Sequence, residues 1–192
     1  MRRSLLPALS LAVLSLPVLA HTGEGAGHHA FAEGFTHPLL GIDHVVAMLA
    51  VGLWARVLGG KALWLLPTCF VLCMVGGWTL AVAGAGLPLV EPLVAGSVFV
   101  LGALIAIAGR LPPALSALLV GALAVFHGHA HGTSLQGAAP AFGLGLVAAT
   151  ALLHATGLAL GQWLASRRRG GLTRGIGAAI ADVGLVLLGA AP

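Results

Sequence analysis

Residues 62–83 read ALWLLPTCFVLCMVGGWTLAVA and contain no charged side chain. A run of about 20 apolar residues is what an α-helix needs to cross about 30 Å of hydrocarbon. The rest of the 192-residue chain has the same character, since 59% of its residues are hydrophobic, 7% are charged and its mean hydropathy is +1.06. A soluble domain carries about 25% charged residues. We therefore expect a membrane protein, with the lipid bilayer as its solvent.

Apolar runs of similar length recur along the chain. They predict an all-α, polytopic membrane bundle of six transmembrane helices, at residues 35–58, 62–83, 89–108, 111–131, 139–165 and 175–190. Two glycine pairs with the spacing of close helix packing in lipid, Gly128 with Gly132 and Gly157 with Gly161, predict contacts between helix backbones. The loops are short, so functional residues are expected within the helices.

The first residues are typical of a secretory signal peptide. Arg2 and Arg3 precede the apolar residues 5–18, and the small residue Ala20 ends a cleavage signal. We expect cleavage after Ala20, and the alternative is a retained first span. The expected organisation is a signal peptide at 1–20, a histidine-rich extracytoplasmic tail at 21–34 and the six-helix transmembrane domain at 35–192.

The basic residues indicate the orientation of this bundle. With the mature N-terminus outside, every Lys and Arg of the mature chain falls in a cytoplasmic loop: Arg56, Lys61, Arg110, Arg167, Arg168, Arg169 and Arg174. Cytoplasmic loops of membrane proteins are enriched in these residues. The pattern predicts a multi-pass protein of the cytoplasmic membrane. Because the basic residues are scattered between apolar runs, the pI of about 10.6 does not indicate a nucleic-acid partner.

Ionisable side chains are concentrated in the first predicted span, which contains HPLLGIDH at residues 37–44. Seven residues at 100° each amount to about 700°, so His37 and His44 share nearly one helix face and Met48 continues it one turn further. These two imidazoles and the thioether are candidate metal ligands. Asp43 lies beside that face, placed either to ligate a metal or to hold an imidazole in one tautomer. Ionisable groups at membrane depth are costly unless paired, and they usually mark a functional site.

The fourth predicted span ends in FHGHAHG at residues 126–132. His127 and His131 are four residues apart, which places two imidazoles on one helix face as metal ligands. His129 faces elsewhere and is a further candidate ligand. Because the first and fourth spans both carry these groups toward their outer ends, we expect the two sets to converge on one metal-binding cavity. His154 in the fifth span is a further candidate ligand, equally explained as a polar contact between helices.

Together these motifs resemble the HupE/UreJ family. The resemblance rests on His37-Pro38-x-x-Gly41-x-Asp43-His44, on Met48 and Gly52-Leu53-Trp54-Ala55, and on Phe126-His127-Gly128-x-Ala130-His131-Gly132. It implies a small protein of the bacterial inner membrane with a cleavable signal sequence. The family is associated with hydrogenase or urease gene clusters, and its members are regarded as nickel, sometimes cobalt, permeases.

The resemblance also implies roles for individual residues. His37, Asp43 and His44 correspond to the family motif required for metal movement, and His127 and His131 to its second motif. One position departs from the pattern. Many members carry a Glu shortly after the second His-Gly pair, where this chain has Thr133-Ser134.

We therefore expect a permease, not an enzyme, that imports Ni²⁺ or Co²⁺ and holds no permanent cofactor. Imidazole with carboxylate suits Ni²⁺, Co²⁺ and Zn²⁺, and only neutral imidazole ligates, so uptake is expected to weaken as the pH falls through about 6.5. His21, His28 and His29 are candidates for capturing the ion outside. The chain has no ATP-binding motif, which leaves membrane potential or protons as driving forces. Its oligomeric state is left open, and a homo-oligomer fits the sequence.

Three other interpretations are compatible with the sequence. A membrane sensor or delivery protein would bind the metal without moving it. A bis-histidine haem electron carrier would use two of His44, His127, His131 and His154 as axial ligands. An intramembrane serine hydrolase would use Ser97 as its nucleophile. Transport into liposomes, a visible spectrum and labelling by a fluorophosphonate separate them.

Overall fold

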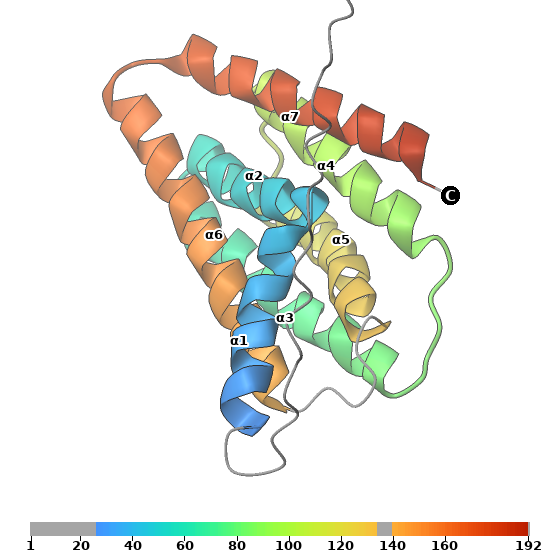
Figure 1. Cartoon of the computed structure of the whole chain (residues 1–192). Coiled ribbons are helices and arrows are strands. Elements are labelled where there is room, and N and C mark those ends of the chain that lie inside the picture. The colour runs from blue at the N-terminus through green and yellow to red at the C-terminus, as the bar shows by residue number, and fades with distance from the viewer. Residues whose placement is uncertain (1–25, 134–139, 192) are drawn as a thin grey trace, which may run out of the picture.

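The structure is a computed structural model that describes residues 26–133 and 140–191. These residues fold entirely into helices joined by short connections, without a strand (Figure 1). The helices are α1 (Ala26–Leu40), α2 (Ile42–Leu58), α3 (Ala62–Val82), α4 (Val90–Ala106), α5 (Pro113–Thr133), α6 (Pro140–Ser166) and α7 (Gly170–Ala190). The predicted all-α architecture is confirmed.

Four of these helices, α3, α5, α6 and α7, are long and apolar enough to cross a membrane. They correspond to the second, fourth, fifth and sixth predicted spans, with ends that differ by a few residues. The third predicted span is the shorter apolar helix α4, of 17 residues. The six-span count therefore stays a prediction, and so does the signal peptide, because residues 1–20 lie outside the described residues.

The first predicted span is not one helix, and this expectation was wrong. The chain breaks at Gly41, where α1 and α2 meet at an angle of 84°. Gly41 has an extended backbone, with φ of −92° and ψ of 115°. Three residues earlier, the ring of Pro38 removes a helical N–H near the end of α1. The helix α1 also begins at Ala26, so residues 26–34 of the expected tail are helical.

Glycines bring the helix backbones together, as predicted for Gly128, Gly132 and Gly157, whereas Gly161 lies against the side chains of Arg56 and Leu53. At Gly128 a Cβ would collide with the backbone carbonyl of Met74, so α5 lies directly against α3. At Gly157 a Cβ would collide with the carbonyl of Leu49, so α6 lies directly against α2. In lipid the hydrophobic effect does not drive helices together, and close backbones supply the dispersion contacts that do. In the same way, α7 packs along α4 and α1 along α6 (Figure 1).

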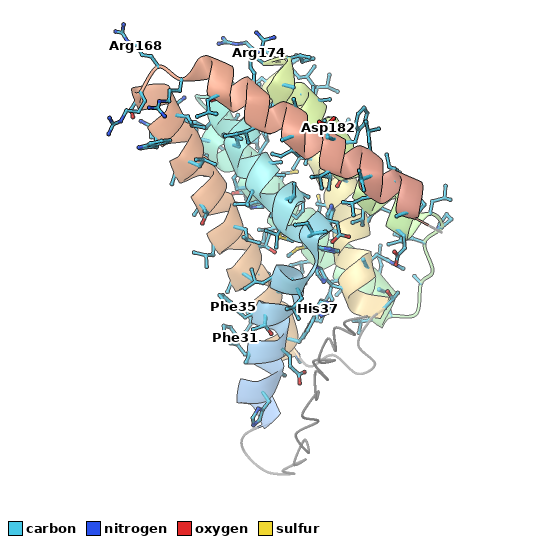
Figure 2. All side chains as sticks on the ribbon, turned by 45° about the horizontal axis from the view of Figure 1, so that its top comes forward. Phe31, Phe35, His37, Arg168, Arg174 and Asp182 are labelled. Atoms are coloured by element: carbon cyan, nitrogen blue, oxygen red, sulfur yellow. The ribbon has the colours of Figure 1, made fainter. Side chains whose placement is uncertain are left out.

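The bundle has two chemically different ends. Arg168 and Arg174 lie at one end, and Phe31, Phe35 and His37 lie at the other (Figure 2). We call the first the arginine end, defined by Arg56, Arg110 and Arg174, and the second the histidine end, defined by His37, His44 and His131. Hydrogen bonds tie the arginine end together: the Trp54 Nε1–H donates to the Gly109 carbonyl at 3.1 Å, and Arg174 Nε donates to the Ala106 carbonyl at 2.8 Å.

Candidate metal centre

The break at Gly41 places His37 at the end of α1 and puts Asp43 and His44 in the first turn of α2. Asp43 Oδ1 accepts two hydrogen bonds from His44, one from the backbone N–H and one from the ring Nδ1–H, each at 2.8 Å. The carboxylate therefore selects the tautomer of His44 that carries its proton on Nδ1. The other ring nitrogen, Nε2, is buried and has no hydrogen-bond partner among the described residues.

The two predicted motifs meet through His131. Its ring centroid lies 4.4 Å from that of His44 and 5.1 Å from that of His37. One turn away on α5, the ring of His127 lies edge-on to His44 with a centroid distance of 4.9 Å. His127 and His131 are almost completely buried. The structure thus brings His37, His44, His127 and His131 together beside Asp43, as the predicted convergence requires.

Histidine and glycine residues of the α5 motif have different tasks. His127 and His131 face α2, whereas Gly128 and Gly132 face the backbone of α3 near Met74 and Trp78. The glycines allow α5 to approach α3 closely, and this packing fixes the helix that carries the imidazoles. The motif therefore combines a polar face with a packing face.

Ser97 on α4 forms a hydrogen bond with His127. The sequence suggested this serine only as a nucleophile. The Ser97 hydroxyl donates its one hydrogen to the Val94 carbonyl at 2.6 Å. Its oxygen lies 2.8 Å from His127 Nε2, which must then be the donor. His127 is left with an unprotonated Nδ1, which is buried and has no hydrogen-bond partner in the described chain. A serine in an apolar helix gave no signal for this role.

His129 lies on a different face of α5, as predicted. Its Nε2–H donates to the carbonyl of Ala85, in the connection between α3 and α4, at 2.8 Å. The side chain thus anchors that connection to the histidine end. Met48, the predicted thioether ligand, is completely buried in the apolar core of the bundle.

His154 on α6 is in contact with the ring of Phe70 and not with the rings of the cluster. Phe70 of α3 packs between it and His127, with centroid distances of 4.9 Å to His154 and 5.6 Å to His127. Both ring nitrogens of His154 are buried without a hydrogen-bond partner in the part of the chain that the structure describes. Sequence reasoning missed Phe70, because one more aromatic residue in an apolar run carries no distinguishing signal.

The expected ion-capturing tail is described only in part. His29 is exposed on α1, and His28 lies in the first turn of the same helix. His21 lies outside the described residues, as does Ser134 of the position that departs from the family pattern.

The chemistry of the cluster suits a borderline divalent cation. His44 and His127 each have one ring nitrogen hydrogen-bonded to an oxygen and the other buried without a hydrogen-bond partner among the described residues, which is the arrangement that outer hydrogen bonds give to metal-ligating histidines. Within residues 26–133 and 140–191, no three His, Cys, Asp or Glu side chains are already grouped as metal ligands. The rings pack against one another instead, so ligation of one ion requires them to rotate about their side-chain torsions.

Comparison with known proteins identifies the family. The profile of the family described as HupE / UreJ protein matches residues 9–187. The chain belongs to the HupE/UreJ family. "Protein HupE" of Rhizobium leguminosarum bv. viciae is 41% identical over 181 residues, which cover 93% of this chain and 95% of the relative. No solved structure matches the chain. The family resemblance seen in the two motifs is therefore confirmed across nearly the whole chain.

Proposed function

We propose that this HupE/UreJ protein is a permease that imports Ni²⁺ or Co²⁺ across the bacterial cytoplasmic membrane. The observation that carries the proposal is the cluster of four imidazoles and one carboxylate, drawn from α1, α2 and α5, at one end of an apolar helix bundle. Family membership supports it independently. The imported ion would supply the maturation of a hydrogenase or a urease.

The tautomers of His44 and His127 suggest how the ion enters. Their unprotonated nitrogens, Nε2 of His44 and Nδ1 of His127, are the lone pairs that neutral imidazole offers to Ni²⁺, Co²⁺ or Zn²⁺. Asp43 stabilises the positive charge that approaches and keeps His44 in its ligating form. A divalent cation entering a negative interior gains about 4.6 kcal/mol per 100 mV of membrane potential, so transport can proceed without ATP.

Uptake of ⁶³Ni²⁺ into proteoliposomes tests the proposal directly. Asp43→Asn removes the charge and disturbs the Nδ1–H acceptor, and we expect a loss of about 10- to 100-fold, the usual effect of losing the partner of a metal-binding histidine. His44→Ala removes the central ring of the cluster and should reduce uptake to background. Competition by unlabelled Co²⁺ and Zn²⁺ then identifies the preferred ion.

A matched control is Glu33→Gln, the same change of carboxylate to amide at an exposed position of α1. It should leave uptake unchanged. Uptake by Asp43→Asn and His44→Ala at the wild-type rate would contradict the permease mechanism. Ni²⁺ binding without any uptake by the wild type would instead favour the sensor or delivery interpretation.

Ring packing argues against a haem carrier. Axial histidines lie on opposite faces of a porphyrin, whereas the ring of His44 is in direct contact with the rings of His127 and His131. His154 is separated from His127 by Phe70 rather than by a cavity shared with it. A visible spectrum of the same preparation without a Soret band is the expected result.

One contact favours the serine hydrolase as a second candidate, because Ser97 Oγ lies within hydrogen-bond distance of His127 Nε2. Two features oppose it. The serine hydrogen is directed to the Val94 carbonyl, and Ser97 is completely buried between helices. His127 Nδ1 also has no acidic partner among the described residues. We expect no labelling of Ser97 by a fluorophosphonate. Labelling would support the serine hydrolase function.

A further inference from the structure

Three arginines from separate parts of the chain surround one cavity at the arginine end. Arg56 comes from the last turn of α2, Arg110 from the connection between α4 and α5, and Arg174 from the first turns of α7. The cavity has a volume of about 530 Å³. It lies at the opposite end of the bundle from the histidine cluster (Figure 2).

Two of these guanidinium groups are held in place without being neutralised. Arg56 Nε donates to Gln162 Oε1 at 2.5 Å, and Arg174 Nε donates to the Ala106 carbonyl at 2.8 Å. Both bonds use Nε, so the terminal amino groups keep their donors. Arg110 is exposed and makes no hydrogen bond within the described chain.

No carboxylate compensates these charges in the described part of the chain. The residues that line the cavity include no Asp or Glu. Among the described residues, the carboxylate of Asp43 is hydrogen-bonded to His44, at the histidine end. Three positive charges around one cavity repel one another, and an anion that binds there relieves the repulsion.

Apart from Thr173, whose hydroxyl donates to the Arg169 carbonyl, the remaining walls are apolar or lack side chains. Val57, Ile105 and Ala165 contribute hydrocarbon, and Gly161, Gly170 and Gly171 contribute open backbone. A cavity lined by both guanidinium groups and hydrocarbon is complementary to an amphiphilic anion. Guanidinium groups bind phosphate oxygens in pairs, and basic pockets between membrane helices bind the headgroups of anionic lipids.

We propose that this arginine cavity binds the phosphate group of an anionic phospholipid. A free phosphate ion shares the headgroup chemistry, but it leaves the apolar wall unused. The bound headgroup would join α2 and α7 to the α4–α5 connection, so it should stabilise the bundle. The proposal does not depend on metal transport.

The test uses the purified full chain in a neutral detergent, with lipid binding followed by native mass spectrometry and stability by thermal unfolding. Added phosphatidylglycerol should remain bound and raise the Tm, whereas phosphatidylcholine should do neither. Arg110→Gln should weaken phosphatidylglycerol binding by about tenfold, the effect of losing one charged hydrogen bond. Because Arg110 is exposed, the Tm without lipid should not change.

Two further variants make the result specific. Arg168→Gln removes an exposed arginine of the same end that does not line the cavity, and it should bind phosphatidylglycerol like the wild type. Arg174→Lys keeps the charge but loses the paired donors, so its binding should be intermediate. Equal binding by wild type and Arg110→Gln, or an equal response to phosphatidylcholine, would overturn the site. An equal Tm shift from inorganic phosphate would overturn the lipid and assign the cavity to the soluble ion.

Discussion

The two histidine motifs reach the same cluster by different means. On α5 the helix is continuous, and the four-residue spacing alone places His127 and His131 on one face. Between α1 and α2 the helix is broken by 84°. In a straight helix, His37 and His44 would lie about 10 Å apart along the axis. With the break, both rings contact the single ring of His131.

The continuous helix α5 and the break between α1 and α2 each depend on a glycine, but for different reasons. Gly128 in the continuous helix is needed by the packing of the whole bundle, because it faces a backbone carbonyl of another helix. Gly41 at the break is needed by its own neighbours, because the Asp43–His44 pair folds back over it. We therefore expect substitutions at the two positions to fail in different ways.

The largest expected effect is that of Gly128→Ala. The new Cβ would collide with the Met74 carbonyl, and a carbonyl within a helix cannot move aside as a flexible side chain can, so α3 and α5 must separate. We expect little folded protein in the membrane fraction, measured by the monodisperse yield after detergent extraction and by the Tm.

Gly76→Ala is the matched control, since it lies on α3 with open space around it. It should be neutral or slightly stabilising, because alanine favours a helix by up to about 1 kcal/mol over glycine. A normal yield and Tm for Gly128→Ala would show that α5 does not need this close approach.

A smaller and more local effect is expected for Gly41→Ala. Alanine tolerates the extended backbone at this position, so the break should persist. The new Cβ, however, would lie 2.8 Å from Asp43 Oδ1 and 3.1 Å from His44 Nδ1. We expect about a tenfold loss of ⁶³Ni²⁺ uptake at a normal Tm, because the ligating imidazole is displaced.

Gly175→Ala, at an open position of α7, controls for the change of residue type and should preserve uptake. If Gly41→Ala unfolds the protein instead, the break is a global element of the fold and the contrast with Gly128 disappears.

The smallest effect is expected for Ser97→Ala. The change removes one neutral hydrogen bond from His127, which corresponds to about a threefold to tenfold loss of uptake. The specific readout is the ¹⁵N spectrum of labelled histidine, in which the Nε2–H tautomer of His127 should give way to a mixture. Ser116→Ala, a buried serine on α5 whose hydroxyl bonds the Leu111 carbonyl, should change neither. An unchanged His127 tautomer in Ser97→Ala would contradict the positioning role.

Sequence patterns predicted the helices better than the break. The apolar segments that form α3, α5 and α6 are recognisable in the sequence. The thickness of the hydrocarbon layer requires about 20 apolar residues in a spanning helix, independently of the helices it packs against. Pro38 and Gly41 are visible as helix breakers, but proline and glycine also occur inside unbroken membrane helices. Indeed, α1 continues past Pro38 to Leu40. Two sets of contacts accompany the bend: His37 packs against His131 of α5, and the Asp43–His44 pair packs against Gly41. The helical periodicity of the sequence does not predict these contacts.

The sequence by itself determined that the chain is a helical membrane protein of the HupE/UreJ family, because composition, apolar run length and the two motifs are local properties. Only the tertiary structure decided which ring nitrogen of His44 and of His127 is held by a hydrogen bond and which is left without a partner among the described residues. Ser97 is 30 residues from His127, and Ala85 is 44 residues from His129. Both hydrogen bonds join segments that are far apart in the sequence, so they depend on how the helices pack. The glycines of α5 allow that packing, but they do not indicate which residue lies opposite each histidine.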